Sequence, residues 1–278
     1  MDVKTRTARS FGYEWRRFRV PALEMEDNFR GYFQFFPSDF FRGKRVLEAG
    51  SGMGRHTYFL AQSARRVVAM DLGDAIHVTA SNVRNKQNVD IVQGDIDYPP
   101  FRPGSFDFVC AIGVLHHLEH PEGGLRRLAS CLRPGGTLHV YLYWALEGAP
   151  GWKRALLTLV TALRRVTVRL PHRLLDPVAW VVAVVGYVLF SVPYRYLSRW
   201  KATAFLVADF PLQRYARDGF QVCYNDQFDR LSAPVERRLT REETIQFLEA
   251  AGLVDIRIEA HYGWLACGKK TLPSDQVG

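Results

Sequence analysis

A loop rich in glycine follows an acidic residue in the run Glu48-Ala49-Gly50-Ser51-Gly52-Met53-Gly54. Glycine lets the chain turn tightly and lets a ligand lie against the backbone, where any Cβ would collide with it. A dinucleotide-binding loop has the spacing G-x-G-x-x-G, but this chain has Arg55 at the third glycine position. The observed G-x-G-x-G spacing suits a zwitterionic amino acid better than a pyrophosphate, because Glu48 can balance an ammonium group. The alternative is an ordinary turn between a strand and a helix.

Further acidic residues follow the next two predicted strands. Asp71 ends the second strand, where a carboxylate can accept hydrogen bonds from both hydroxyls of a ribose. Asp95 follows the third, where it can accept from an adenine amino group while Ile96 packs on the ring. The carboxyl ends of parallel strands share one edge of an open α/β sheet, which is where ligands bind. Together these residues predict a site for an adenosyl group joined to an amino acid.

Two adjacent histidines, His116 and His117, follow the fourth predicted strand at the same edge. An imidazole titrates near neutral pH, so either ring can serve as a general base. Adjacent side chains in extended backbone point in opposite directions, so we expect one ring to face the pocket and the other to pack. The alternative is that both are structural. Tyr141, Tyr143 and Trp144 are further candidates for pocket walls or for core packing.

Short β-branched runs alternate with helical spacing between residues 45 and 143, a pattern typical of βαβ units and a parallel sheet. The predicted strands are Val46–Ala49, Arg66–Asp71, Asp90–Gln93, Phe106–Ile112 and Thr137–Tyr143. Helices are predicted over 55–63 and 74–85, and a third contains Leu125, Leu128 and Leu132 and ends at Pro134-Gly135-Gly136. Near the C-terminus, Thr240 and Glu243 form a capping box for a helix over 241–251, Gly252 is its C-cap, and strands follow over 255–260 and 263–269.

The stretch from Val46 to Tyr143 resembles the class I S-adenosylmethionine-dependent methyltransferases. VLEAGSGMGR resembles their motif I, VVAMD motif II and QGDID motif III, and DFVCAIGVLHHL and LRPGGTL resemble the later motifs. The resemblance implies an α/β fold with a doubly wound, mostly parallel seven-stranded sheet, a largely helical insertion after strand 5, and S-adenosylmethionine as cofactor.

The resemblance also implies cofactor contacts by position. The methionine part is assigned to Glu48, Gly50, Ser51, Gly52 and Gly54, the ribose to Asp71 and Leu72, the adenine to Asp95 and Ile96, and Ile112 lies beside the cofactor. An N-terminal F-G-x-x-W-x-x-F segment, similar to one in family members, adds Phe11, Gly12 and Trp15 as part of a lid. The alternative for these aromatic residues is ordinary packing.

We expect four segments along the chain. Residues 1–42 form an aromatic-rich helical lid segment, and residues 43–143 form the cofactor-binding Rossmann-like core. Residues 144–239 form a helical insertion or substrate cap, and residues 240–278 supply the last helix and the closing strands. The four cysteines are scattered without a C-x-x-C pair, so neither a metal site nor a disulfide framework is predicted. The basic N-terminus lacks the apolar run of a secretory signal, and we expect a cytoplasmic chain.

The insertion carries most of the net charge of +9. Residues 150–201 contain nine basic residues and one acidic residue, a net charge of +8. Leu156, Leu159, Val160 and Leu163 have helical spacing, with Arg154 and Arg165 on the other face. This basic amphipathic helix can pack on the core, enclose a hydrophobic acceptor, or rest on an anionic membrane surface. The apolar stretch Val178–Val192 stops at Pro193, short of the roughly 20 residues needed to span a bilayer, so no span is expected.

Three functions are compatible with these features. The first is methylation of a small acceptor, hydrophobic or lipid-like, such as a natural product. The second is RNA methylation, with the same positive charge on phosphates, although the basic residues alternate with long aliphatic runs and no RNA-binding module is recognisable. The third is a non-catalytic binding or scaffold protein, in which a broken glycine loop would be expected.

Overall fold

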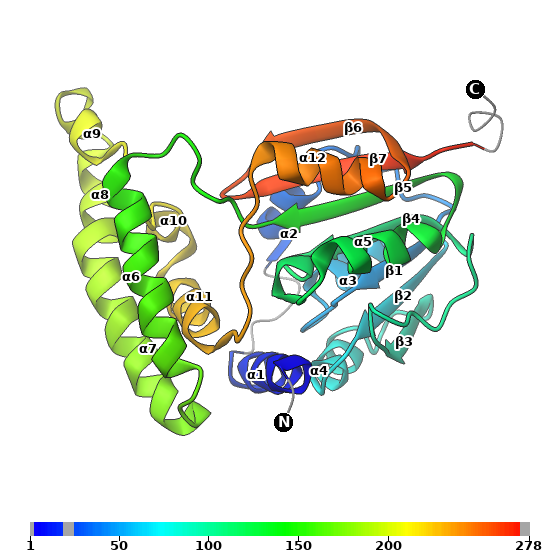
Figure 1. Cartoon of the computed structure of the whole chain (residues 1–278), viewed down its shortest axis with the longest axis horizontal. Helices are drawn as coiled ribbons and strands as arrows, with labels where there is room; N and C mark the ends of the chain where they lie inside the picture. Colours follow the sequence, from blue (N-terminus) through cyan, green and yellow to red (C-terminus); the bar gives the residue numbers. More distant parts are fainter. Residues whose placement is uncertain (1–2, 19–24, 273–278) are drawn as a thin grey trace. The chain divides into compact units, whose positions relative to one another are not determined.

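The computed structural model describes residues 3–18 and 25–272. The chain divides into two compact units, drawn in Figure 1. Unit 1 consists of residues 1–147 and 235–278, and unit 2 of residues 148–234. The segments 144–147 and 235–239, predicted as part of the insertion, therefore belong to unit 1. They are held there because Trp144 pairs with Leu239 as a bridge and the Ala145 amide donates to the Leu239 carbonyl at 3.0 Å.

Unit 1 contains the predicted seven-stranded, mostly parallel sheet, in the order β3-β2-β1-β4-β5-β7-β6. The strands are β1 (Arg45–Ala49), β2 (Arg66–Asp71), β3 (Val89–Gln93), β4 (Phe106–Ile112), β5 (Leu132–Leu142), β6 (Leu253–Ala260) and β7 (Trp264–Lys270). Only β7 runs antiparallel to its neighbours. The chain leaves β1 toward β2 and leaves β4 toward β5, so the strand order reverses between β1 and β4, where ligands bind in such sheets.

One prediction at this level was wrong. The third helix was expected to include Leu132 and to end at Pro134-Gly135-Gly136, with the next strand starting at Thr137. Instead, α5 (Pro121–Ser130) stops earlier and β5 begins at Leu132. The segment Pro134-Gly135-Gly136 lies within β5, whose pairing with β4 shifts register between Phe106 and Phe108. A β-bulge of this kind accommodates proline and glycine inside a strand.

Helices cover both faces of the sheet because neighbouring residues of each strand point to opposite sides. On one face, α5 and α12 (Arg241–Ala250) pack on Leu47 and Val109. On the other face, α2 (Glu26–Tyr32) and α3 (Arg55–Leu60) pack on Val46 and Phe108 in a cluster rich in phenylalanine. The predicted capping box of Thr240 and Glu243 is present at the start of α12.

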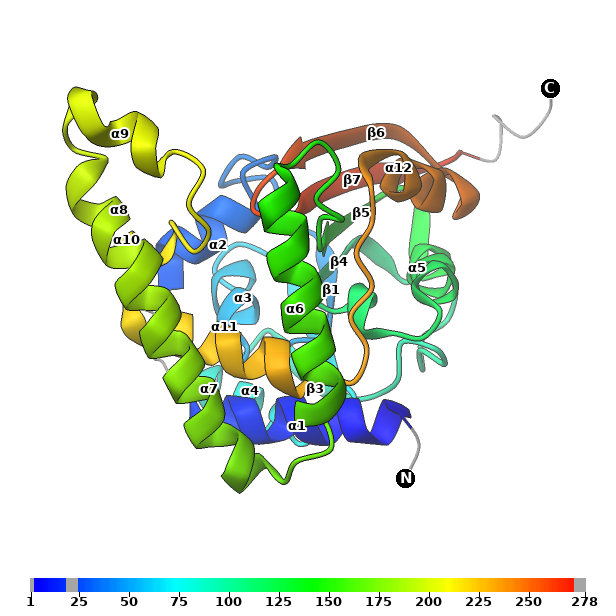
Figure 2. The ribbon, with the colours of Figure 1, turned by 60° about the vertical axis from the view of Figure 1, so that its left-hand side comes forward.

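Unit 2 is helical and has its own core. Its helices are α6 (Gly151–Thr167), α7 (His172–Gly186), α8 (Val192–Leu197), α9 (Lys201–Val207), α10 (Tyr215–Asp218) and α11 (Phe220–Ser232). In Figures 1 and 2, α11 lies against both α6 and α7. Leu175, Ala179 and Ala183 are buried at helical spacing along α7, and the small alanines let α11 approach closely.

The apolar segment of unit 2 is longer than the sequence predicts. A π-helical turn, Tyr187–Ser191, joins α7 to α8, so a single helix runs from His172 to Leu197 through Pro193. Proline lacks the N–H that would bond to the preceding turn, and it normally interrupts an α-helix. The π-helical turn just before Pro193 lets the helix continue through it. This helix has 26 residues and a mean hydropathy of 1.9, with 22% of its most apolar window buried. By length and composition alone it is the one helix among the described residues able to cross a membrane.

Candidate active site

The glycine loop lies at the carboxyl edge of the sheet, where β1 to β4 end. Gly50, Gly52 and Gly54 all have positive φ values, of 79°, 56° and 78°. A Cβ on Gly50 would overlap Val114, in the segment that follows β4. The backbone turn after β1 and the segment after β4 therefore meet at the point where the strand order reverses. Gly54, in the left-handed region, precedes α3, and a Cβ there would come within 2.8 Å of Thr79 Cγ2.

Two side chains of α4 (Ala75–Asn82) hold the loop from the side of β2. Thr79 Oγ1 donates to the Gly52 carbonyl at 2.8 Å and lies 3.1 Å from Ser51 Oγ. Asn82 Nδ2 donates to the Met53 carbonyl at 2.8 Å. These bonds fix the loop carbonyls on the α4 side, and sequence reasoning did not assign Thr79 or Asn82 to the site.

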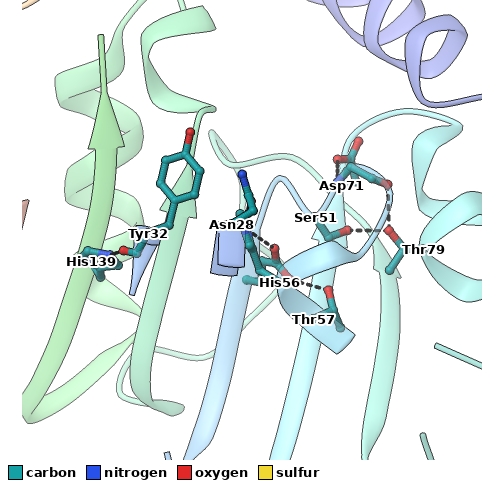
Figure 3. A network of polar contacts seen from close by, with 10 residues as sticks. Asn28, Tyr32, Ser51, His56, Thr57, Asp71, Thr79 and His139 are labelled. Carbon is teal, nitrogen blue, oxygen red and sulfur yellow. Dashed lines mark hydrogen bonds and ion pairs between the residues drawn. The ribbon is translucent and has the colours of Figure 1, made fainter. Parts of the chain in front are cut away.

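Glu48 is buried in a polar network. Figure 3 labels its partners His56 and Thr57, together with Asn28. Thr57 Oγ1 donates to one carboxyl oxygen, and His56 Nδ1 lies 3.4 Å from the other. His56 Nε2 is in turn 3.4 Å from Asn28 Oδ1 of α2. Burial raises the pKa of Glu48 to about 7, with the Thr57 hydroxyl acting in the opposite direction. Burial also lowers the pKa of His56 well below its ordinary value, so the imidazole is neutral. A cation close to Glu48 would favour the carboxylate.

Asp71 ties the end of β2 to the glycine loop. One carboxyl oxygen accepts from the Gly52 amide at 2.9 Å, and the other accepts from the Gly73 amide at 3.0 Å. Burial raises the pKa of Asp71, and the two amides oppose that shift. Each carboxylate oxygen retains a lone pair, so Asp71 can still accept from ligand hydroxyls. Leu72 is 37% exposed at the same edge.

The two residues predicted to bind adenine differ in their exposure to solvent. Ile96 is buried in the core cluster with α5, and Ile112 is also buried at the end of β4. Asp95 is partly exposed, and its carboxylate forms an ion pair with Lys4 of the N-terminal helix α1 (Val3–Arg17). Lys4 also pairs with Asp97 at 2.6 Å. Lys4 lies on a segment distant in sequence, and no local pattern indicates it.

Helix α1 (Val3–Arg17) lies over the carboxyl edge. Trp15 contacts Gly52, whose Cβ position is 3.0 Å from the indole Nε1, and it also stacks with the Arg55 guanidinium. Phe11 contacts His117 with ring centroids 4.9 Å apart. A Cβ on Gly73 would lie 2.8 Å from the Ala8 carbonyl, so the helix approaches the loop after β2 closely. Of the three predicted lid residues, Trp15 lies on the glycine loop and Phe11 on the histidine pair, whereas Gly12 lies next to Asp74.

The two histidines have different surroundings. His116 is fully buried and stacks on Tyr143 with centroids 3.7 Å apart, and within the described part of the chain neither ring nitrogen has a hydrogen-bond partner. Burial, followed by His117 and Arg238, lowers the pKa of His116 well below its ordinary value. His117 Nδ1 lies 2.8 Å from the Val235 carbonyl. A carbonyl only accepts, so Nδ1 is the protonated nitrogen in the neutral form of the ring, and the lone pair of that form is on Nε2.

The residues present fit an adenosyl amino acid. Asp71 ends β2 and Asp95 follows the end of the adjacent β3, and both carboxylates are partly accessible. Behind the loop, Glu48 is a buried acid whose pKa is near neutral. When bound, S-adenosylmethionine would supply an electrophilic methyl group at this edge.

Comparison with known proteins gives the same assignment for the central part of the chain. Residues 47–140 match the model of a methyltransferase domain. A ubiquinone biosynthesis O-methyltransferase of Xanthomonas campestris is 35% identical over 102 residues, covering 34% of this chain and 41% of that protein. A tRNA U34 carboxymethyltransferase of Methylococcus capsulatus is 33% identical over 113 residues, covering 39% of this chain and 35% of that protein. The chain thus spans less than half the length of these relatives.

A solved structure agrees at the level of the fold. Human N-acetylserotonin methyltransferase in complex with S-adenosylmethionine is 14% identical, with a TM-score of 0.56, covering 98% of this chain and 59% of that one. With the sheet order, the glycine loop and the acidic strand ends described above, the family match shows that residues 47–140 form a methyltransferase domain, with the fold of the class I S-adenosylmethionine-dependent enzymes.

Proposed function

We propose that the chain transfers a methyl group from S-adenosylmethionine to a small acceptor that is hydrophobic or lipid-like. The observation that carries the proposal is the hydrogen bond of His117 Nδ1 to the Val235 carbonyl, at the edge of the sheet where Asp71 ends β2 and Asp95 follows β3. The name of the Xanthomonas relative, an O-methyltransferase of ubiquinone biosynthesis, supports an acceptor of this class.

The chemistry demands little of the protein. Methyl transfer from a sulfonium is an in-line displacement in which positive charge disperses, so the chain acts mainly by aligning the acceptor and excluding water. For a hydroxyl acceptor, the proton must leave as the oxygen–carbon bond forms. We assign this proton to His117 Nε2, since Nδ1 is committed to the Val235 carbonyl.

RNA is the second candidate acceptor. The tRNA-modifying relative and the positive charge of residues 150–201 favour it. The exposed surface of unit 2 opposes it, because large apolar side chains such as Trp180, Val185 and Phe205 are exposed there together with the arginines. Nucleic-acid surfaces are usually polar and strongly cationic.

The test is transfer of labelled methyl groups to a cell extract. Purified chain and methyl-labelled S-adenosylmethionine are incubated with extract, which is then separated into organic-soluble, nucleic-acid and protein fractions. We expect label in the organic-soluble fraction, and we expect a His117→Gln variant that still binds S-adenosylhomocysteine to lose it. Label confined to nucleic acid would replace the small acceptor by RNA. Absence of label from every fraction, with cofactor bound, would favour the non-catalytic alternative.

A further inference from the structure

Unit 2 exposes most of the large apolar side chains that this chain leaves in contact with solvent. Of the 20 exposed large hydrophobic residues in the described part of the chain, 14 lie between Trp152 and Leu206. Soluble proteins rarely expose extended apolar surface without a binding role.

The exposed apolar residues of the long helix form a stripe. Leu174, Val181, Val185 and Val188 are all more than half exposed. At about 100° per residue, they lie opposite the buried stripe of Leu175, Ala179 and Ala183 that packs within unit 2. Helix α6 has a similar exposed row in Leu159 and Val166, 66% and 61% exposed. The core of unit 2 therefore covers only part of the apolar face of α6.

Basic residues stand at the ends of these helices. Arg165, Arg169 and Arg173 are exposed around the turn from α6 to α7, and Arg195, Arg199 and Lys201 are exposed around the turn from α8 to α9. Arg173 lies in the first turn of α7, where the helix dipole disfavours a cation, so helix stability does not explain it. The nearby acids, in contrast, are engaged inside the unit: Asp176 accepts from Tyr224, and Asp209 pairs with Lys153.

The strand pairing in unit 1 restricts whether the long helix can span a bilayer. The long helix lies between β5 and β7 in the sequence, and these two strands are paired from Thr137 with Lys269 to Leu142 with Trp264. A single crossing would place the paired strands on opposite sides of the membrane. A second crossing would require α6, whose last turn and following segment carry three arginines, or α11, which carries Asp226, Asp229 and Arg230. Charged residues in the bilayer interior are costly.

We infer that unit 2 is a membrane-docking module that lies in the interface of an anionic bilayer, with the stripes of α6 and α7 in the acyl boundary and the basic ends on lipid phosphates. Helices with an apolar face, flanking cations and tryptophan bind bilayers in this way. Trp180 and Trp200, 49% and 71% exposed, suit the headgroup level. This inference is independent of the acceptor proposed above.

Flotation of the full chain with vesicles tests the inference. We expect it to float with vesicles of phosphatidylcholine and phosphatidylglycerol, to float poorly with phosphatidylcholine alone, and to be released by high salt and by alkaline carbonate. Arg165→Gln, Arg169→Gln and Arg173→Gln together should weaken binding on the order of a hundredfold, since each cation contributes about fivefold near an anionic surface. Arg84→Gln, Arg102→Gln and Arg126→Gln are the matched control, because they remove the same charge from exposed sites of unit 1.

A second set of variants removes the apolar stripe. Val181→Gln, Val185→Gln and Val188→Gln keep good helix formers at exposed positions and should weaken flotation at least tenfold without changing the circular dichroism spectrum. Ile91→Gln, Val254→Gln and Leu272→Gln, at exposed apolar sites of unit 1, should leave it unchanged. The inference is overturned if the full chain does not float, if it resists carbonate as a spanning protein does, or if the stripe variants only convert an oligomer to a monomer. Binding of RNA in place of vesicles, unaffected by the stripe variants, would also overturn it.

Discussion

At the residue scale, the buried acid behind the glycine loop gives the site a dependence on pH. Glu48 has a pKa of about 7 in the folded chain because burial disfavours its charge, whereas an exposed glutamate titrates near 4.3. Between these values the folded chain holds a proton that the unfolded chain has released. The contribution of protonated Glu48 to the free energy of unfolding is therefore complete below about pH 4 and is lost as the pH rises through about 7.

Glu48→Gln should remove this dependence. At pH 4 the variant and the parent chain are expected to have similar free energies of unfolding, because glutamine resembles the protonated acid. At pH 8 the variant should be more stable, by up to about 4 kcal/mol for a pKa shift of this size. Urea unfolding at both pH values measures the difference. Equal stabilities at pH 8 would mean that Glu48 is ionised at no cost, contrary to its burial.

The histidine pair gives a second prediction at this scale. His117→Gln should lower kcat by roughly a hundredfold to ten-thousandfold, the usual contribution of a general base, with little change in cofactor affinity. His116→Phe is the matched control: it keeps the stacking on Tyr143 and removes only nitrogens that have no partner in the described structure. We expect it to retain kcat within a few-fold. A larger loss in His116→Phe than in His117→Gln would reverse the assignment.

At the element scale, the meeting of two loops explains why residue 50 is glycine. Gly50→Ala forces both a Cβ against Val114 and a positive φ on alanine, and we expect it to destabilise the chain by about 2–4 kcal/mol. Gly104→Ala shares the positive φ, at 75°, without a close contact, and should cost only about 1 kcal/mol. Adding Val114→Ala should restore part of the Gly50→Ala loss in urea unfolding. If Val114→Ala restores none of the lost stability, the two loops are not in steric contact at this point.

Helix α1 is the other element that shapes the site. Because Trp15 lies on Gly52 and on Arg55, Trp15→Ala should weaken S-adenosylhomocysteine binding on the order of tenfold, mainly through faster dissociation in stopped-flow measurements. Trp15→Phe keeps an aromatic ring there and should lose less. If both variants bind as the parent chain does, Trp15 only packs and is not part of a lid.

Much of this arrangement follows from local sequence. The near-continuous apolar runs of β2 and β4 and the capping box at Thr240 predict their elements correctly, because each depends on neighbouring residues alone. The start of β5 and the helix through Pro193 were wrong, since a β-bulge and a π turn each override a breaker residue. The partners of the site residues, such as Lys4 for Asp95 and Val235 for His117, come from distant segments, so only the folded chain brings them together.

At the scale of the whole molecule, the residues of the candidate cofactor site all belong to unit 1. The connections between the two units are adjacent, because Ala145 bonds to Leu239. Replacing residues 148–234 by a short glycine-serine linker should leave a folded unit 1 that binds S-adenosylhomocysteine with unchanged affinity but no longer floats with anionic vesicles. Calorimetry and flotation on the same preparation check both parts. Lost cofactor affinity in a well-folded product would show that unit 2 completes the cofactor site.

The most direct measurement is a calorimetric titration of the full chain with S-adenosylhomocysteine. We expect one site per chain, an affinity that falls at least tenfold in Asp71→Ala as charge-assisted hydrogen bonds are lost, and no change in Asp74→Ala, a more exposed acid at the same edge that pairs with Arg16. Absence of binding by the folded parent chain, or equal binding by Asp71→Ala, would contradict the cofactor site described here.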